Sequence, residues 1–390
     1  MAGIYIHIPF CKQACTYCNF HFSTSLKLRE KMVEAIVKEM KPLTPKGEKV
    51  EDFSIVAKET IETIYFGGGT PSILLEDELQ LIFDALYERF EFADEIEITL
   101  EANPDDITDV KLLCWKKMGV NRLSVGIQSF NEDELKWMNR AHSAAESLAC
   151  IDKIKAAGFT NFSVDLIYGS PLLSNEDWKQ NVQTVIEKGI PHISCYALTV
   201  EPKTILAKMI EAKKTATTDS EKQAQQFLLL MEWLSAAGYE HYEISNFAKP
   251  NLQSKHNSSY WQGKKYYGFG PSAHSFDGVR IRRWNIANNA LYIQSIQKNG
   301  VPYEEEVLTQ TQQLNEYIMT SLRTVEGLDL NYVKIKFGEA FSTKLTQQSA
   351  KFSSTKKIVL ENLKIILTNE GKLFADGIAA DLFFNAEDVF

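Results

Sequence analysis

Six short apolar runs alternate with amphipathic helical patterns along the first two hundred residues. The runs predict strands at Ile4–Ile8, Thr63–Phe66, Glu95–Leu100, Arg122–Val125, Ser163–Ile167 and Ile193–Leu198. The patterns between them predict helices at Leu26–Met40, Asp77–Phe90, Val110–Met118, Ala144–Ala157 and Asp177–Lys188. Gly119, Gly158 and Gly189 follow three of these helices, where a C-terminal stop is expected. Strands separated by helices pair in parallel through right-handed crossovers. We therefore predict an α/β fold, a partial (β/α)6 TIM-like barrel rather than a closed eight-unit one.

The pattern changes after residue 200. Predicted elements are a helix at Glu221–Ala237, a short strand at Tyr239–Phe247 and a polar, aromatic loop over Lys249–Arg283. The last ninety residues predict a smaller, mainly helical domain with a β-ribbon, in a winged-helix-like arrangement. Its expected elements are helices at Leu314–Leu322 and Leu330–Phe337, and a strand and terminal helix within Leu373–Leu382. We divide the chain into a barrel core (1–200), a barrel extension (201–295) and a C-terminal domain (296–390).

Composition excludes several classes of protein. The net charge of -9 argues against nucleic-acid binding, which needs a basic surface. The sequence has neither an apolar run of eighteen residues nor a secretory leader, so we expect no transmembrane span. Three of the six cysteines, Cys114, Cys150 and Cys195, are isolated in apolar segments and are interpreted as buried small side chains. Such uneven cysteine usage favours a reducing cytoplasm over a disulfide framework.

Polar and glycine-rich segments follow each predicted barrel strand. They are Cys11–Cys18, Gly67–Pro71, Glu101–Pro104, Gly126–Phe130, Asp165 with Tyr168–Pro171, and Tyr196. The C-terminal ends of barrel strands share one rim, and that rim carries the active site in (β/α) barrels. We therefore expect these segments to form one site.

Cys11, Cys15 and Cys18 have the spacing C-x₃-C-x₂-C, which is typical of radical S-adenosylmethionine (SAM) enzymes. Three thiolates cannot fill the four cysteine positions of an ordinary iron–sulfur cluster, so one iron of a 4Fe–4S cluster stays open. The amino and carboxylate groups of SAM would occupy that open iron. The alternatives are a zinc site completed by His7 or His21, and three unrelated buried thiols.

The other rim residues each have a structural alternative. Gly67–Thr70 allows close backbone approach and is interpreted as the site of the SAM amino group, although a tight turn also explains it. Glu101 is placed to hold a ribose or an ammonium group, or else to act as a cap or turn residue. Gln128 is ambiguous by itself, and Arg140 and Asp165 allow either ligand contacts or a buried ion pair.

A second constellation is His256-Asn257-Ser258-Ser259-Tyr260-Trp261. A histidine in a polar loop beside two aromatic residues suits an axial haem ligand with flat stacking surfaces. It equally suits a structural loop whose histidine bonds to the backbone. His274 is a further candidate that we interpret as structural, and Arg282 and Arg283 either pair with propionates or face solvent.

Taken together, these motifs resemble the coproporphyrinogen III oxidase-like radical SAM family. They run in order along nearly all 390 residues: Tyr5–Phe20, Gly67–Pro71, Glu101–Pro104, Gly126–Phe130, Asp165–Pro171, Glu243–Phe247 and His256–Trp261. The resemblance implies a radical SAM barrel, a separate C-terminal domain and cluster ligation by Cys11, Cys15 and Cys18. It implies SAM contacts from Tyr5, Tyr17, Gly68, Gly69, Thr70, Glu101, Gln128, Arg140 and Asp165. It also implies haem binding at His256, through a motif that marks the haem-chaperone branch.

Two differences from the oxidase branch of this family bear on function. Members of that branch carry a further cysteine where this chain has Phe20, and an arm before the first strand, whereas Tyr5 lies near the start here. We therefore expect a cytoplasmic haem chaperone that delivers haem to respiratory proteins, with peripheral membrane association and a homodimeric state as further expectations. The alternative is an oxygen-independent oxidase that decarboxylates coproporphyrinogen III, so whether the chain is an enzyme stays open.

Overall fold

The computed structural model describes residues 2–41 and 59–385. The strands are β1 (Ala2–Ile8), β2 (Thr60–Gly68), β3 (Glu91–Ala102), β4 (Arg122–Gln128), β5 (Phe162–Tyr168), β6 (His192–Ala197), β7 (Glu240–Glu243), β8 (Asn246–Ala248), β9 (Tyr266–Phe269), β10 (His274–Phe276), β11 (Ile281–Asn285), β12 (Tyr303–Val307), β13 (Leu328–Asp329), β14 (Ile358–Glu361) and β15 (Lys364–Leu367). The α-helices are α1 (Arg29–Met40), α2 (Glu76–Arg89), α3 (Asp109–Lys117), α4 (Glu132–Trp137), α5 (Ala144–Ala156), α6 (Asn175–Glu187), α7 (Ile205–Glu211), α8 (Ser220–Ala236), α9 (Lys255–Trp261), α10 (Asn289–Gln297), α11 (Gln310–Leu322), α12 (Leu330–Phe337), α13 (Glu339–Ser354), α14 (Asn369–Lys372) and α15 (Ala375–Asp381). Short 3₁₀ turns are η1 (Leu26–Leu28), η2 (Pro71–Ile73) and η3 (Pro104–Asp106).

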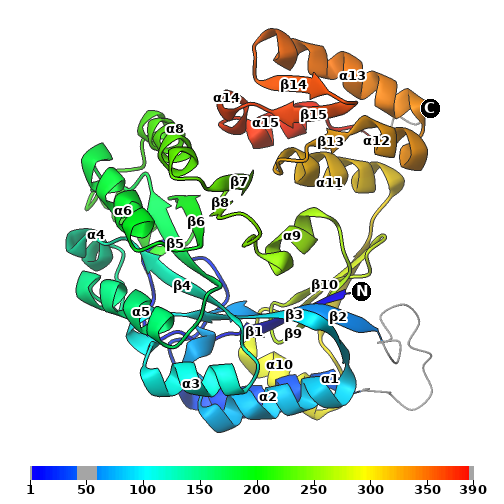
Figure 1. Cartoon of the computed structure of the whole chain (residues 1–390). Coiled ribbons are helices and arrows are strands. Elements are labelled where there is room, and N and C mark those ends of the chain that lie inside the picture. Colours follow the sequence, from blue (N-terminus) through cyan, green and yellow to red (C-terminus); the bar gives the residue numbers. More distant parts are fainter. Residues whose placement is uncertain (1, 42–58, 386–390) are drawn as a thin grey trace.

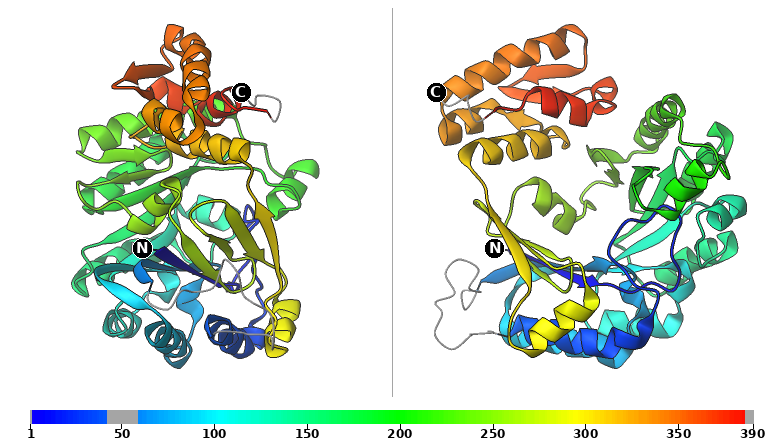
Figure 2. Two further views of the ribbon diagram at one scale, coloured as in Figure 1. Left: turned by 90° about the vertical axis from the view of Figure 1, so that its right-hand side faces the viewer. Right: turned by 180° about the vertical axis from the view of Figure 1, so that it is seen from behind.

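One curved sheet forms most of the molecule (Figure 1). Its strand order is β12-β11-β10-β9-β1-β2-β3-β4-β5-β6-β8-β7, and β1 to β6 pair in parallel in chain order. The helices that connect these strands lie on the convex side of the sheet (Figures 1 and 2). The predicted partial barrel of six β/α units is confirmed, and antiparallel strands extend it at both edges.

The two faces of the parallel strands differ in chemistry. On β1, Ile4, Ile6 and Ile8 are buried in the main hydrophobic core. The alternating positions carry Tyr5 and His7, because successive side chains of a strand point to opposite faces. The concave face of the barrel is therefore lined by polar and aromatic side chains, and the convex face supplies the apolar core.

Local periodicity placed the parallel part of the fold correctly. All six predicted strands and all five predicted helices of the first two hundred residues are present, each within a few residues of the expected bounds. Gly119, Gly158 and Gly189 adopt φ values of 101°, 77° and 58°, which L side chains rarely adopt, so glycine suits these helix ends.

Three expectations after residue 200 are wrong. Residues 239–247 form a hairpin of β7 and β8 rather than one strand, because the chain turns between Glu243 and Asn246. The expected loop over Lys249–Arg283 contains α9 and three strands. Residues 373–382 contain α15 and no strand, since the ribbon is completed earlier by β14 and β15.

The C-terminal domain has its own hydrophobic core, which extends from Leu314 to Phe384. Its order is α11, β13, α12, α13, β14, β15, with a sheet ordered β13-β15-β14, and this is the winged-helix arrangement that the sequence predicted. Strand β12 still pairs with β11 of the large sheet. The domain division at residues 200 and 295 stays a prediction.

Candidate functional site

The cysteine loop follows β1 and is held by backbone contacts on two sides. Cys11 donates its N–H to the Ser23 carbonyl at 3.1 Å, and Thr16 donates to the Met138 carbonyl at 3.0 Å. The Asn139 side chain donates to the Ala14 carbonyl at 2.7 Å. The segment after β4 therefore supports a loop whose own sequence has little regular structure.

The three thiols are partly exposed at this rim and meet donors from other strands. The Thr70 hydroxyl lies 3.5 Å from Cys11 Sγ, and Arg140 Nη1 lies 3.2 Å from Cys15 Sγ. Such donors stabilise thiolates, and three soft thiolates are the usual ligands of an iron–sulfur cluster. The donor set at this loop therefore fits the 4Fe–4S group.

Protonation opposes metal binding in this form of the loop. Burial raises the pKa of Cys11 to about 11, and burial also raises the pKa of Cys18. Within the described residues, no three Cys, His, Asp or Glu side chains converge as they do around an ion. Cluster binding thus requires the thiols to lose protons and turn toward one another.

The zinc alternative gains no fourth ligand from the neighbouring histidines. His7 Nε2 is hydrogen-bonded to the His21 carbonyl at 2.9 Å, and His7 Nδ1 to the Tyr5 hydroxyl at 3.2 Å. His21 Nε2 bonds the Asn289 side chain at 2.7 Å. Burial lowers the pKa of His7 to about 4, so its ring is neutral but engaged.

The glycine-rich turn after β2 lies directly against the cysteine loop. A Cβ on Gly69 would stand 2.5 Å from the Phe10 carbonyl oxygen, and one on Gly68 would stand 2.5 Å from the His7 ring. Gly68 also has φ of 102°. Close packing explains two of these glycines without a ligand, which supports the tight-turn alternative, and the SAM contact at this turn stays a prediction.

Glu101 and Asp165 are partly buried carboxyls on the concave face. Burial raises the pKa of Glu101 to about 7 and that of Asp165 to about 6. Glu101 Oε1 accepts a hydrogen bond from the Tyr65 hydroxyl at 2.7 Å, and no Lys or Arg pairs with it among the residues described. A carboxyl in this state suits a cationic ligand, which would return it to the ionised form.

Arg140 does not form the ion pair with Asp165 that we considered as an alternative. Its Nη2 donates to Asn103 Oδ1 at 2.8 Å and to the Gly126 carbonyl at 2.6 Å. Gln128 stands at a β4 irregularity with φ of 68°, a left-handed conformation that is strained for a side chain. Arg140 thus connects the β3 and β4 ends to the cysteine loop.

Two tyrosines complete the predicted SAM set. Tyr5 lies on β1, stacked on Tyr65 with ring centroids 6.2 Å apart. Tyr17 follows Cys15 in the loop and packs on the small apolar cluster of Leu198 and Leu206. The nine predicted SAM residues thus lie on the concave face of the barrel or at its C-terminal rim, and direct contacts join Thr70 and Arg140 to the cysteine loop.

His256 lies away from this rim and is fully engaged. It stands in the first turn of α9 rather than in a loop, because Ser254 caps the helix and Glu97 accepts the His256 N–H at 3.0 Å. Its Nδ1 is 2.8 Å from the Thr63 hydroxyl and its Nε2 is 2.9 Å from the Tyr260 hydroxyl. It is 1% exposed, and burial lowers its pKa to about 3. Its role as a haem ligand stays a prediction that requires both hydrogen bonds to break.

Sequence reasoning missed residues that tie these parts together. Tyr65 stacks on His256 with centroids 5.0 Å apart while its hydroxyl reaches Glu101. Arg122, 1% exposed, lies 4.0 Å from Glu97 across the concave face. The signal that could have identified them is the alternation of side chains along each strand. Tyr65 shares a face of β2 with the glycine turn, and Glu97 shares a face of β3 with Glu101. Arg122 shares a face of β4 with Gly126.

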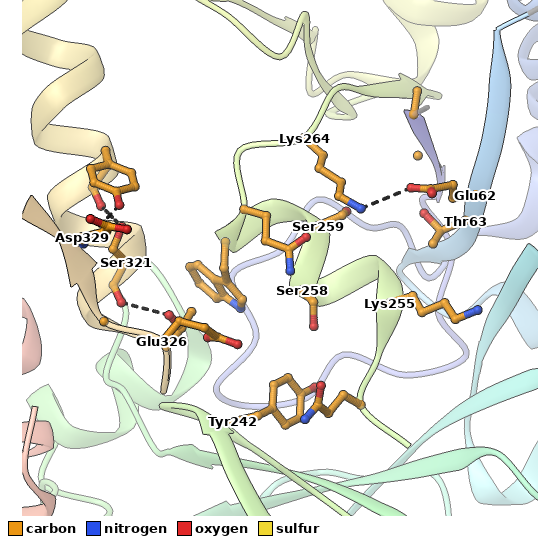
Figure 3. Close-up of a pocket in the computed structure, with 18 of the residues that line it drawn as sticks. Glu62, Thr63, Tyr242, Lys255, Ser258, Ser259, Lys264, Ser321, Glu326 and Asp329 are labelled. Atoms are coloured by element: carbon orange, nitrogen blue, oxygen red, sulfur yellow. Dashed lines mark hydrogen bonds and ion pairs between the residues drawn. The ribbon is translucent and has the colours of Figure 1, made fainter. Parts of the chain in front are cut away.

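Two cavities flank the end of α9. The first, about 710 Å³, is polar and is lined by residues of β2, α9 and the C-terminal domain. Figure 3 shows side chains that line this cavity, including Lys264 and Glu62, whose ion pair measures 3.2 Å. The second, about 780 Å³, is aromatic and includes Trp261 and His274. Arg282 and Arg283, for which the sequence left propionate pairing and solvent exposure as alternatives, are both paired with glutamates.

Comparisons with known proteins cover both parts of the chain. The Radical SAM superfamily model matches residues 5–185, and the HemN C-terminal domain model matches residues 308–374. The heme chaperone HemW of Bacillus subtilis (strain 168) is 31% identical, over 97% of this chain and 98% of its own length. HemW of Synechocystis sp. (strain ATCC 27184 / PCC 6803 / Kazusa) is 34% identical over 83% of this chain and 78% of its own. The solved coproporphyrinogen III oxidase (HemN) of Escherichia coli matches with a TM-score of 0.83 at 21% identity, over 98% of this chain and 90% of that chain, which shows a shared fold.

Proposed function

Because the chain belongs to the HemW family of radical SAM proteins, we propose that it is a haem chaperone, which binds haem and passes it to other proteins. The observation that carries this proposal is the nearly full-length similarity to the HemW of Bacillus subtilis. As a radical SAM protein, the chain has a 4Fe–4S cluster and SAM as cofactors. When bound, the cluster supplies the electron that cleaves the sulfonium of SAM.

We propose that Cys11, Cys15 and Cys18 hold the cluster. The Thr70 and Arg140 contacts to two of the sulfur atoms support this, since both donors stabilise a thiolate. The proposed SAM contacts are Tyr5, Tyr17, Gly68, Gly69, Thr70, Glu101, Gln128, Arg140 and Asp165. Their placement on the concave face and at its C-terminal rim supports the set, and Glu101 is the carboxyl suited to the cationic part of the ligand.

The clients are proposed to be respiratory proteins that need haem. The chain would act in the cytoplasm as a homodimer and meet these clients at the membrane periphery. Among the described residues no helix is long and apolar enough to cross a membrane.

The direct test is anaerobic reconstitution with iron and sulfide, followed by haem titration and a coproporphyrinogen assay. We expect one haem per chain, transfer to an apo-acceptor and no protoporphyrinogen. Phe20, which takes the place of the oxidase cysteine, is 69% exposed and offers no thiol there. Steady conversion of coproporphyrinogen III would contradict the chaperone assignment.

A variant pair tests the cluster. Cys15→Ala should lose the charge-transfer absorption of the reconstituted cluster, because it removes one of three ligands. Cys114→Ala, a buried cysteine on α3, is the matched control and should retain that absorption. Equal iron content in both variants would contradict the assignment of the cysteine loop.

A further inference from the structure

The aromatic cavity lies between the extension of the large sheet and the C-terminal domain. Strands β9 to β11 form one wall, helices α11 and α12 form the other, and the end of α9 lies between them. Its volume of about 780 Å³ is within the range that proteins use for cofactor-sized ligands, roughly 300–1,000 Å³. Tyr260 and Trp261 from the H-N-S-S-Y-W segment line it, whereas His256 of that segment does not.

His274 in this cavity is chemically unlike His256. It is exposed, and neither ring nitrogen has a hydrogen-bond partner among the residues described. Its ring lies against the Trp284 indole, with centroids 5.9 Å apart and planes 25° apart. Although part of the side chain meets solvent, partial desolvation of the ring and the nearby Arg282 guanidinium lower its pKa, so the ring is neutral at neutral pH and a nitrogen lone pair is available to a metal.

The remaining walls suit a flat apolar ligand. Tyr266 meets Tyr260 edge to face at 4.8 Å and also packs beside Phe276. Tyr332 faces them from α12 in the C-terminal domain. Aromatic side chains of this kind, with a few placed polar groups, are the usual lining of cofactor sites.

The charges at the cavity leave one cation for an anionic ligand. Arg282 donates to Glu306 and Glu316 and is neutralised by them. Lys264 is paired with Glu62. Lys336 is exposed, and its ammonium bonds the neutral Tyr332 hydroxyl at 2.9 Å with no acidic partner in the described parts of the chain.

We propose that haem binds in the aromatic cavity with His274 as an axial ligand of its iron and Lys336 near a propionate. Tyr260 and Trp261 of the H-N-S-S-Y-W segment contact the porphyrin, and His256 holds α9 in place beneath them. The assignment rests on the proposed haem-chaperone function and deepens it by naming the site.

The test is haem titration of the full-length chain, read by the Soret band and by electron paramagnetic resonance of the ferric complex. His274→Ala should weaken haem binding at least tenfold and change the resonance of the ligated iron, and added imidazole should restore it. His256→Gln tests the competing ligand that the sequence predicts, and it should keep the wild-type spectrum although its melting temperature falls. Loss of haem from His256→Gln but not from His274→Ala would assign the iron to His256 and overturn the proposal. Circular dichroism verifies that each variant is folded.

A substitution by a different iron-binding side chain distinguishes iron ligation from a merely structural effect at position 274. His274→Cys should bind haem with a shifted Soret band, because a thiolate then replaces imidazole at the iron. If His274→Ala and His274→Cys both show the wild-type affinity and spectrum, the assignment is overturned while the chaperone function stands. If the wild-type chain itself binds no stoichiometric haem, the proposed haem-chaperone function is contradicted, whatever the variants show.

A matched pair of lysine variants tests the propionate contact. Lys336→Glu should weaken binding of haem but leave binding of haem dimethyl ester nearly unchanged, since the ester lacks the anionic groups. Lys334→Glu, on the same helix but paired with Glu339 and outside the cavity, should leave both affinities unchanged. Equal losses for haem and its ester would place the propionates elsewhere.

Discussion

Glu101 shows how one residue can link protonation to ligand binding. It is a partly buried carboxyl that has no Lys or Arg partner among the residues described, and burial raises its pKa to about 7. A folded-state pKa above the ordinary value of about 4.3 means that the folded chain holds this proton more tightly than the unfolded chain. The resulting stability is present at low pH and is lost as the pH rises toward 7. A cationic ligand reverses that preference, because it favours the carboxylate.

SAM affinity should therefore depend on pH through Glu101. Below pH 7 binding must expel the proton, so affinity should fall by up to about tenfold per pH unit, and Glu101→Gln should remove this dependence. Isothermal titration calorimetry of SAM at pH 6 and pH 8, in buffers of different ionisation enthalpy, measures the released proton. Wild-type affinity that is constant between these pH values would contradict the prediction.

The surroundings of His256 could not be predicted from the sequence. Its histidine, tyrosine and tryptophan pattern was compatible with a haem-ligand loop and equally with a structural loop. Thr63, which bonds the ring Nδ1, is 193 positions away in the chain, and Glu97, which accepts the backbone N–H, is 159 positions away, so no local pattern could reveal these two contacts. Of the three partners, only Tyr260, which bonds Nε2, is close in sequence. The cysteine triplet, in contrast, carries its spacing within eight residues and was recognised directly.

At the scale of elements, helix α9 depends on a carboxylate from a barrel strand. Glu97 accepts the N–H groups of Lys255 and His256 at 3.1 and 3.0 Å. The same carboxylate is the counter-ion of Arg122, which is 1% exposed. One side chain thus satisfies the start of a helix and neutralises a buried cation.

Glu97→Leu should lower the free energy of unfolding by about 3–5 kcal/mol, because it leaves the Arg122 charge buried without a partner. Urea denaturation followed by far-ultraviolet circular dichroism measures the loss. The double variant Glu97→Leu/Arg122→Met should recover part of it, and Glu95→Gln on the exposed part of β3 should change stability by less than about 0.5 kcal/mol. A single variant as stable as the wild type would show that the pair is unimportant.

Elements that depend on their own periodicity were predictable, and elements that depend on distant partners were not. The parallel strands carry short segments with buried apolar residues at alternate positions, and their helices carry one apolar face, so both kinds of element could be predicted from local sequence. Helix α9 is seven residues long, with caps supplied by Ser254 and by a distant strand, and it was read as a loop. The β7–β8 turn was also missed, although the contact across it, from the Asn246 side chain to Glu243, is local.

At the scale of the whole molecule, the C-terminal domain closes one side of the aromatic cavity. Arg282 on β11 is bonded to Glu316 on α11 at 2.9 Å, which joins the large sheet to that domain. Arg323 and Asp376 form a further pair inside the domain at 2.7 Å. A ligand in the cavity would contact both bodies, so its binding energy would be shared between them.

Haem binding should therefore protect both walls from hydrogen exchange. At a haem concentration of one hundred times the dissociation constant, the stabilisation is about 2.7 kcal/mol. Mass-spectrometric hydrogen exchange should show slower exchange over residues 266–284 and 313–336, with α2 and α3 unchanged as the internal reference. Protection confined to one of these two segments would mean that the ligand contacts only that wall.

The central position of β1 has a consequence for synthesis. Gly3 pairs in parallel with Thr63 on one side and with Tyr266 on the other, so the first strand joins two parts of the sheet made far apart in time. A ribosome must release about two thirds of the chain before that second neighbour exists. The strand that leads into the cysteine loop therefore gains its second neighbour only after the barrel extension has been synthesised.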